Sequence, residues 1–213
     1  MLGQKRSTRA RKKAAQARSR ATVAALVEAT ARILVREGFD RASTNRIAEE
    51  AGVSIGSLYQ YFPGKEALVA AVIERHNHDL MQVVRQAMAE AEREPIGVGI
   101  DCLVAAAIEA HRVHPALHRV LAEQTPRTGE LEGVELFHRE ALNLFRAYLE
   151  DHRDALVVTD LDLAAFICVT SIEALTHSAV IHRPKILSGE ARQRLVAETS
   201  RMIAAYLGVR GGS

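Results

Sequence analysis

The sequence predicts an all-α chain with an N-terminal three-helix domain, in which two short helices meet at a tight turn, and a C-terminal helical bundle. Aromatic residues make up only 4% of the 213 residues and Trp is absent, so Ala, Leu, Val and Ile must build the core. Such a composition, with few strand-like runs, is typical of helical proteins. We divide the chain into an arm at 1–18, a helix-turn-helix domain at 19–75 and a C-terminal domain at 76–213.

The first 27 residues place basic charge on an otherwise acidic chain. They hold eight basic side chains and no acidic one, whereas the rest of the chain has 20 basic and 26 acidic residues, for a net charge of −6. We expect the arm at 1–18 to be disordered alone and attracted to a polyanion. The alternative is a solvated tail that only aids solubility. The basic residues are Lys5, Arg6, Arg9, Arg11, Lys12, Lys13, Arg18 and Arg20.

A long helix is expected from Ser19 to Glu37, because apolar residues recur there at helical spacing. Gly38 should end it in the left-handed conformation. The apolar face should form the core of the three-helix unit. Its residues are Val23, Leu26, Val27, Thr30, Ile33 and Leu34.

The stretch from 43 to 62 predicts two short helices joined by a turn. Either Ser43 or Thr44 can cap the first helix, Gly52 is a natural left-handed stop, and Ser54 can cap the second. Leu58 and Phe62 are four residues apart and give the second helix one apolar stripe to bury.

The other faces of the second short helix lack Lys and Glu and carry two tyrosines, an amide and a glycine. A helix in the DNA major groove uses small residues where backbones approach, hydroxyls for phosphates, and amide or apolar groups for base edges. The alternative is a helical hairpin with aromatic packing. We predict double-stranded DNA as a partner, which also favours DNA contact by the basic arm. The predicted phosphate contacts are Thr44, Tyr59, Tyr61 and Lys65, and the groove or base contacts are Asn45, Arg46, Ile55, Gly56, Ser57 and Gln60.

The run from Leu26 to Val72 resembles the N-terminal DNA-binding domain of the TetR family of bacterial transcriptional regulators. The resemblance implies a helix-turn-helix formed by the second and third helices, an all-helical C-terminal domain, a homodimer and a small-molecule effector. One departure is Gly64, where the family commonly has Ser, Asn or Asp before the next helix. The matching residues are Glu28-Ala29, Glu37-Gly38-Phe39, Thr44, Ile47-Ala48, Ala51-Gly52-Val53, Gly56-Ser57-Leu58-Tyr59, Tyr61-Phe62, Lys65-Glu66-Ala67-Leu68 and Val72.

The C-terminal domain should contain helical segments near 98–113, 115–124, 131–152, 160–182 and 189–207, after a linker marked by Pro95, Gly97 and Gly99. Segment 160–182 is apolar on most of its circumference, so it is either central in a core or shared between subunits. The resemblance implies that 160–182 and 189–207 form the dimer interface, as a four-helix bundle with their symmetry mates. A purely intrachain core is the alternative.

A ligand pocket is expected between the helices of this domain, since such sites are mostly apolar with a few polar anchors. We selected residues that interrupt otherwise aliphatic helix faces, although each could also be plain core. The pocket would then be apolar with neutral or weakly basic anchors, and these residues do not specify the chemistry of the ligand. The candidates are Cys102, Ala106, His111, Phe137, Leu144, Phe145, Phe166, Thr170 and His177.

The sequence argues against an enzyme or a metalloprotein. It contains no ordered Ser/His/Asp set, glycine-rich phosphate loop or HExxH motif. His111, His114 and His118 nominally share a helix face, which could suggest a metal site, but Pro115 interrupts that helix. His76 and the next histidine are two residues apart and cannot share a face. We predict no catalytic residue, metal or cofactor.

The cellular setting follows from what the sequence lacks. Cys102 and Cys168 have no paired spacing, which favours buried thiols in a reducing compartment. No apolar stretch reaches the length of a membrane span and no signal core is evident, so we expect a cytoplasmic protein without a membrane partner.

These observations predict a ligand-responsive, sequence-specific transcriptional regulator, a dimeric repressor that binds a palindromic operator and is released by a small-molecule effector. The first alternative is an architectural DNA binder that uses the basic arm and has no effector. The second is a small helical enzyme, which would turn over a substrate without DNA.

Overall fold

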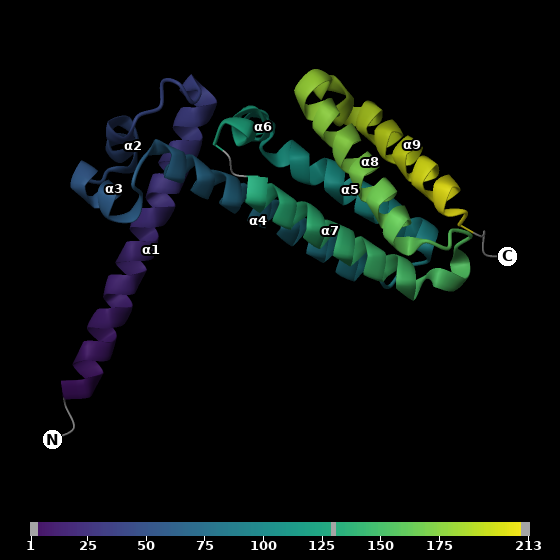
Figure 1. Ribbon diagram of the computed structural model, residues 1–213, viewed down its shortest axis with the longest axis horizontal. Helices are drawn as coiled ribbons and strands as arrows, with labels where there is room; N and C mark the ends of the chain where they lie inside the picture. The colour runs from purple at the N-terminus through teal and green to yellow at the C-terminus, as the bar shows by residue number, and fades with distance from the viewer. Residues whose placement is uncertain (1–3, 129–130, 210–213) are drawn as a thin grey trace. The chain divides into compact units, whose positions relative to one another are not determined.

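The computed structural model describes residues 4–128 and 131–209 (Figure 1), and these residues form helices and loops without a β-strand, which confirms the all-α prediction. The elements are α1 (Gln4–Glu37), α2 (Thr44–Ala51), α3 (Ile55–Tyr61), α4 (Lys65–Ala91), α5 (Ile96–Val113), α6 (Pro115–Thr128), α7 (Leu131–Asp151), the 3-10 helix η1 (Arg153–Ala155), α8 (Leu161–His182), the 3-10 helix η2 (Pro184–Leu187) and α9 (Gly189–Leu207).

The chain divides into two compact units. The first contains the residues up to 74 together with 123–128, and the second contains 75–122 and the described residues from 131 onward. Helix α4 belongs to both units, because the boundary at Glu74 lies within it.

The core of the first unit forms where the apolar face of α1 meets α2, α3 and the start of α4. Leu26 and Ile33 of α1 are fully buried, as are Ile47 of α2, Leu58 of α3 and Leu68 of α4. These are the aliphatic positions that helical periodicity places on one face of each helix. Phe62 is only half-buried, so the short third helix rests mainly on Leu58.

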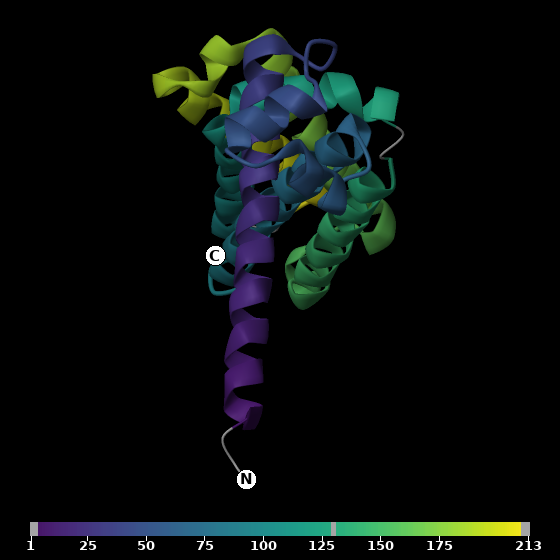
Figure 2. The same cartoon turned by 90° about the vertical axis from the view of Figure 1, so that its left-hand side faces the viewer.

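The N-terminal arm differs from the sequence-based expectation. Residues 4–18 are not disordered but continue α1 as one uninterrupted helix of 34 residues (Figure 1 and Figure 2). The physical reason is that the small residues between the charges are mostly Ala, and Ala, Arg, Lys and Gln are all strong helix formers. A helix already nucleated by packing at 26–34 needs only the favourable propagation step to extend towards the N-terminus.

The second unit packs α8 against α7 and α5, and α5 against α9. Tyr148 of α7 is among its largest buried side chains and donates a hydrogen bond to the carbonyl oxygen of Ile96 at 3.3 Å. Gly97 and Gly99 lie in the first turn of α5 instead of a linker, which corrects the sequence-based prediction. A Cβ atom on Gly99 would lie 3.1 Å from Cζ of Tyr148, so the close approach of the two helices requires glycine at this position.

Helix α8 also corrects the expectation that no segment is long enough to span a membrane. Its 22 residues include an 18-residue apolar window with a mean hydropathy of 1.6, so the helix passes that test by length and composition alone. In the structure, 44% of the apolar window is buried by the other helices. Nine α8 residues, including Ala164, Cys168 and Val180, belong to the buried set. Its hydrophobicity therefore serves a helix that packs on several sides.

Candidate functional site

The turn between α2 and α3 is built by local interactions that the sequence encodes. The side chain of Ser43 accepts a hydrogen bond from the backbone N–H of Arg46, and that of Ser54 accepts one from the N–H of Ser57 at 3.1 Å. Gly52 has φ 68°, in the left-handed region that glycine adopts without strain, and its N–H satisfies the last carbonyls of α2. The two helices are thereby held at a sharp angle, as a helix-turn-helix requires.

Helix α3 presents an exposed face of aromatic, apolar and amide groups. Tyr59 is 54% exposed, Ile55 38% and Tyr61 36%, and Gln60 and Gly56 are also exposed. Only Leu58 of this helix is buried. Tyrosines and an isoleucine of this exposure leave apolar surface in water along one side of a short helix. This face contains six of the ten predicted DNA contacts, with Ser57 half-buried at its edge.

The remaining predicted DNA contacts lie around α3 on neighbouring helices. Thr44 begins α2, and its Oγ1 lies 3.1 Å from the hydroxyl of Tyr59, within hydrogen-bonding distance across the turn. Asn45 and Arg46 are exposed in the first turn of α2. Lys65 begins α4 and is half-buried. The structure therefore brings all ten residues into the same compact unit.

Two of these cations have protein partners that the sequence analysis missed. The guanidinium of Arg46 forms a two-armed ion pair with Glu37, with one N···O distance of 2.8 Å. The ammonium of Lys65 donates to the carbonyl oxygen of Phe39 at 3.1 Å and lies 4.0 Å from the centre of the Phe39 ring. Because Glu37 and Phe39 are far from these cations in sequence, helix spacing carries no signal for either contact.

Further ion pairs join α1 to the end of α2. Glu50 accepts hydrogen bonds from Arg32 at 3.1 Å and from Arg36 at 3.2 Å. Arg36 also bonds Glu37, so the group connects to Arg46. The hydrogen bonds from Arg36 are the main cause that lowers the pKa of Glu50. These exposed pairs orient α2 on α1, although each contributes little to stability by itself.

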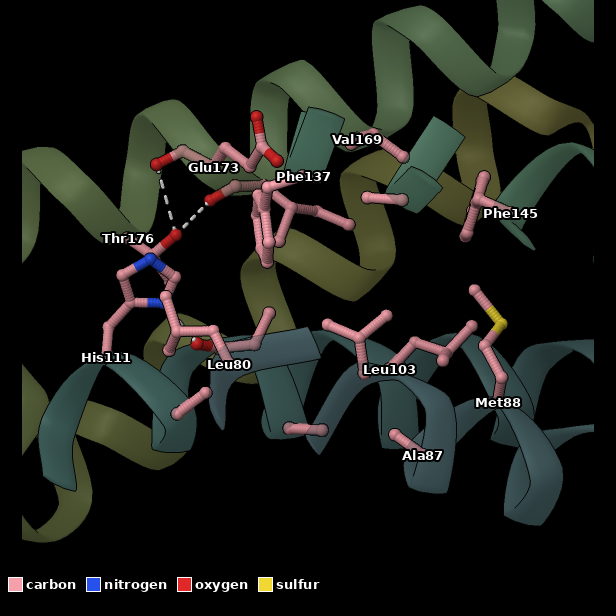
Figure 3. Close-up of a pocket in the computed structure, with 16 residues that line it drawn as sticks. Leu80, Ala87, Met88, Leu103, His111, Phe137, Phe145, Val169, Glu173 and Thr176 are labelled. Atoms are coloured by element: carbon pink, nitrogen blue, oxygen red, sulfur yellow. Dashed lines mark hydrogen bonds between the residues drawn. The ribbon is translucent and has the colours of Figure 1, made fainter. Parts of the chain in front are cut away.

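An apolar cavity lies in the second unit, between α4, α5, α7 and α8 (Figure 3). It contains about 650 Å³ of space free of atoms, part of it open to solvent, and is lined by 16 residues, of which 13 are apolar. The polar members are His111, Glu173 and Thr176. An apolar cavity with a few polar groups at one end matches the usual composition of a small-molecule site.

The cavity contains four of the nine predicted ligand residues: Ala106, His111, Phe137 and Phe145. The other five lie outside it. Cys102 is half-buried along a shallow groove between α5 and α9, Leu144 packs against the core, Thr170 has a buried hydroxyl, His177 contacts other histidines, and Phe166 is 50% exposed on the surface of α8.

The α8 residues that line the cavity differ from the predicted ones for a geometric reason. The cavity is lined by Val169, Ile172, Glu173 and Thr176, which recur at helical spacing on one face. At 100° per residue, the predicted set of Phe166, Thr170 and His177 is centred roughly a quarter of a turn away. Because α8 is apolar on nearly all sides, its sequence does not indicate which face meets the cavity. The other missed lining residues are Leu80, Val84, Ala87, Met88, Leu103, Ala107, Ala110 and Ala141.

Four histidines from four helices form a cluster next to the cavity: His76 of α4, His111 of α5, His118 of α6 and His177 of α8. His118 Nδ1 lies 3.1 Å from His76 Nε2, and His118 Nε2 lies 3.1 Å from His177 Nδ1. The rings of His111 and His118 meet edge to face with centroids 4.7 Å apart. Burial lowers the pKa of His76 to about 4 and that of His118 to about 3, and it also lowers the pKa of His111.

This cluster does not form a single-ion site. One ring nitrogen of His118 faces His76 and the other faces His177, so a single ion cannot bind these three imidazoles together. Within the described ranges, no group of three or more His, Cys, Asp or Glu is arranged to hold a metal ion. The spacing of histidines along one helix carries no signal for a cluster that forms between helices.

Helices α8 and α9 also expose large apolar side chains outside the cavity. On α8, Leu163 is 52% exposed, Phe166 50% and Leu175 40%; on α9, Met202 is 45% exposed and Tyr206 38%. Large apolar groups gathered on adjacent helices are typical of a surface that another protein covers.

Comparison with known proteins agrees with both units. The family described as "Bacterial regulatory proteins, tetR family" matches residues 26–72, and the family described as "Tetracyclin repressor-like, C-terminal domain" matches residues 95–207. The nucleoid occlusion factor SlmA of Haemophilus ducreyi is 31% identical over 85 residues, which cover 40% of this chain and 41% of SlmA. The chain thus spans less than half the length of this relative.

Two solved structures share the fold over most of the chain. A TetR-family regulator from Mesorhizobium loti superposes with a TM-score of 0.72 and 19% identity, covering 89% of this chain and 98% of that one. The complex of SmeT with triclosan superposes with a TM-score of 0.67 and 21% identity, covering 90% of this chain and 93% of that one. Since the two family matches together span most of the sequence and include a helix-turn-helix, this chain belongs to the TetR family of DNA-binding transcriptional regulators.

Proposed function

We propose that the chain acts in the cytoplasm as a dimeric repressor that binds a palindromic operator and releases it when a small molecule fills the cavity of the second unit. The observation that supports this proposal is the combination, in one chain, of a helix-turn-helix with an exposed third helix and an apolar cavity. Helix α4 links these two features. It begins in the first unit, which contains α3, and it lines the cavity with Leu80 and Val84.

The exposed face of α3 is proposed to enter the major groove. Gln60 and Ile55 can reach base edges, an amide by paired hydrogen bonds and an apolar group by contact with a thymine methyl. Tyr59 and Tyr61 can donate their hydroxyls to phosphates, which position the helix without reading sequence. Arg46 is exposed beside this face and would exchange Glu37 for a phosphate or base upon binding.

The homodimer is proposed to form through α8 and α9. Their exposed apolar residues would be covered by the same helices of a second copy, which satisfies the self-complementarity that a two-fold interface needs. Two copies would present two α3 helices about 34 Å apart, or a multiple of that spacing, so the operator should be a palindrome.

Release is proposed to follow a shift in population. A ligand that fits the cavity better when the two recognition helices are mis-spaced lowers operator affinity by the ratio of its affinities for the two states. The cavity provides a route for this effect, because a ligand there would touch α4 directly. SmeT, which shares the fold, binds triclosan, and this fits a small-molecule effector for the present chain.

The test is selection of a randomised duplex library by the full-length protein and by a variant that lacks residues 1–18, both at moderate salt. We expect both proteins to enrich the same palindrome, which then serves as the probe for effector screening. Loss of all enrichment in the full-length protein would contradict the proposal.

A second candidate function is an architectural DNA binder without an effector. It is favoured by similarity to SlmA, a nucleoid occlusion factor, and by the basic N-terminal residues. This function predicts binding that weakens steeply with salt, enriches no motif and is lost when residues 1–18 are removed. The same selection therefore separates the two functions.

A further inference from the structure

The polar groups of the cavity gather at one end of it. Figure 3 shows the imidazole of His111 and the hydroxyl of Thr176 facing one another across that end, with aliphatic and aromatic side chains lining the rest. Glu173 lies one turn before Thr176 on α8. A ligand with one polar head group and an apolar body would place its head between His111 and Thr176.

The hydrogen bonds of His111 define what it offers to a ligand. Its Nδ1 lies 2.8 Å from the carbonyl oxygen of Ala107, and a carbonyl can only accept, so Nδ1 carries the proton. Burial lowers the pKa of His111 from its ordinary value, so the ring is neutral at neutral pH. A neutral imidazole has one N–H, which leaves Nε2 with a lone pair that accepts a hydrogen bond.

The other two polar groups are also acceptors. The hydroxyl of Thr176 donates its proton to the backbone carbonyls of α8 at Ile172 and Glu173, so only its oxygen lone pairs remain for a ligand. The carboxylate of Glu173 lies 2.8 Å from Nδ1 of His138 and is an acceptor by nature. The 16 lining residues include no Lys or Arg.

We propose that the cavity selects an apolar molecule with one uncharged hydroxyl head group, an aliphatic alcohol or a phenol, and rejects the corresponding carboxylate. A hydroxyl donates to Nε2 of His111 and is inexpensive to remove from water. A carboxylate would find acceptors in place of donors and would lie near the charge of Glu173, so it would lose its hydration without compensation. This inference rests on the proposed function of the cavity as the effector site.

The test measures binding of three probes to the full-length protein by titration calorimetry at pH 7.5. The probes are 1-octanol, octanoate and 1-methoxyheptane, an ether with as many heavy atoms as the alcohol but no hydroxyl proton. We expect 1-octanol to bind about 3- to 10-fold more tightly than the ether, the range of one hydrogen bond. Octanoate should bind more than about tenfold more weakly than 1-octanol.

His111→Phe tests whether Nε2 is the acceptor. The variant should bind the ether with unchanged affinity, which shows that the cavity is intact, but should lose the preference for the alcohol. His114→Phe is the matched control, because His114 is exposed at the end of the same helix and does not line the cavity. It should keep the preference. An alcohol preference that survives in His111→Phe would overturn the inference, as would octanoate that binds more tightly than 1-octanol.

The same probes, added to the protein on its selected operator, separate this inference from the proposed function. Octanoate that binds tightly and releases the operator would overturn the hydroxyl preference while the regulator remains ligand-responsive. Tight binding of 1-octanol without any effect on operator affinity would support the hydroxyl preference and contradict effector release. Failure of all three probes to bind would overturn the inference.

Discussion

The hydroxyl of Tyr59 on α3 and Oγ1 of Thr44 at the start of α2 lie 3.1 Å apart, so a hydrogen bond spans the turn between the two helices. Tyr59 is otherwise 54% exposed, and this contact is what orients its ring. Both residues are proposed to bind phosphates, and the bond makes them one unit. A phosphate oxygen reaching Tyr59 would also be close to Thr44.

The first prediction follows from this pairing. Tyr59→Phe and Thr44→Val should each weaken DNA binding by about 0.5 to 1.5 kcal/mol, the net value of one hydrogen bond. The loss should be the same for operator and for unrelated duplex, since phosphate contacts carry no sequence information. The double variant should lose little more than the worse single variant, because each change already breaks the shared contact. Anisotropy titrations on both duplexes measure these values; fully additive losses would show that the residues act independently.

Gln60 gives the second prediction. It is exposed on α3 and is the only amide of that helix, so it is the residue best suited to paired hydrogen bonds with a base. Gln60→Ala should change the preference at one or two base pairs of each half-site, by about 1 to 3 kcal/mol each. Repeating the library selection measures the change, with Tyr59→Phe as a control that should keep the wild-type motif. A Gln60→Ala motif identical to the wild type would remove Gln60 from base recognition.

The close approach of α5 and α7 gives the third prediction. A Cβ atom on Gly99 would overlap the hydroxyl oxygen of Tyr148 and lie 3.1 Å from the carbonyl oxygen of Ala91, whereas one on Gly97 would meet nothing within 4 Å. Gly99→Ala should therefore lower the free energy of unfolding by about 1 to 3 kcal/mol. Gly97→Ala, in the same helical turn, should be neutral or stabilising by up to about 1 kcal/mol.

Urea unfolding of the two glycine variants provides the measurement. Combining Gly99→Ala with Tyr148→Phe should recover part of the loss, because the overlapping hydroxyl is removed. Equal stability of Gly99→Ala and Gly97→Ala would show that Tyr148 moves aside without cost.

The fourth prediction concerns stability in acid. The pKa of His76 is about 4 and that of His118 about 3, both below the ordinary value of 6.5, with burial as the main cause. The neighbouring His111 and His177 disfavour a further positive charge, whereas Asp79 favours it at His76. Between pH 6.5 and these lowered pKa values, the two histidines bind protons in the unfolded chain but remain mostly neutral in the folded chain. Stability should therefore be complete above pH 6.5 and should fall as the pH drops towards about 4, by at most about 1.4 kcal/mol per pH unit for each histidine.

Because carboxylates also contribute to acid unfolding, the measurement is a comparison of variants between pH 7 and pH 4.5. His118→Gln should show a weaker pH dependence of the free energy of unfolding than the wild type. His78→Gln is the control, since His78 is exposed on α4 and outside the cluster. A pH dependence that is unchanged in His118→Gln would show that the cluster does not titrate as described.

The helix-turn-helix was predictable because local interactions build it. Ser43, Gly52 and Ser54 act on residues within four positions of themselves, and Leu58 is the one residue of α3 that helical spacing buries. The exposed face of α3 follows from the same periodicity. For these elements, the chain specifies both the structure and the surface it leaves in water.

The cavity and the histidine cluster depend instead on contacts between distant residues. Helix α8 is apolar on nearly every side, so only the positions of α4, α5 and α7 decide that Thr176 faces the cavity and Phe166 faces outward. His76 and His118 are 42 residues apart, and their contact exists because two helices cross there. The periodicity of apolar residues indicates how amphipathic a helix is. When a helix has several apolar faces, the packing of the neighbouring helices decides which face lines the cavity. The amino-acid sequence thus specifies the helix-turn-helix of this regulator locally, whereas packing in three dimensions creates its apolar cavity.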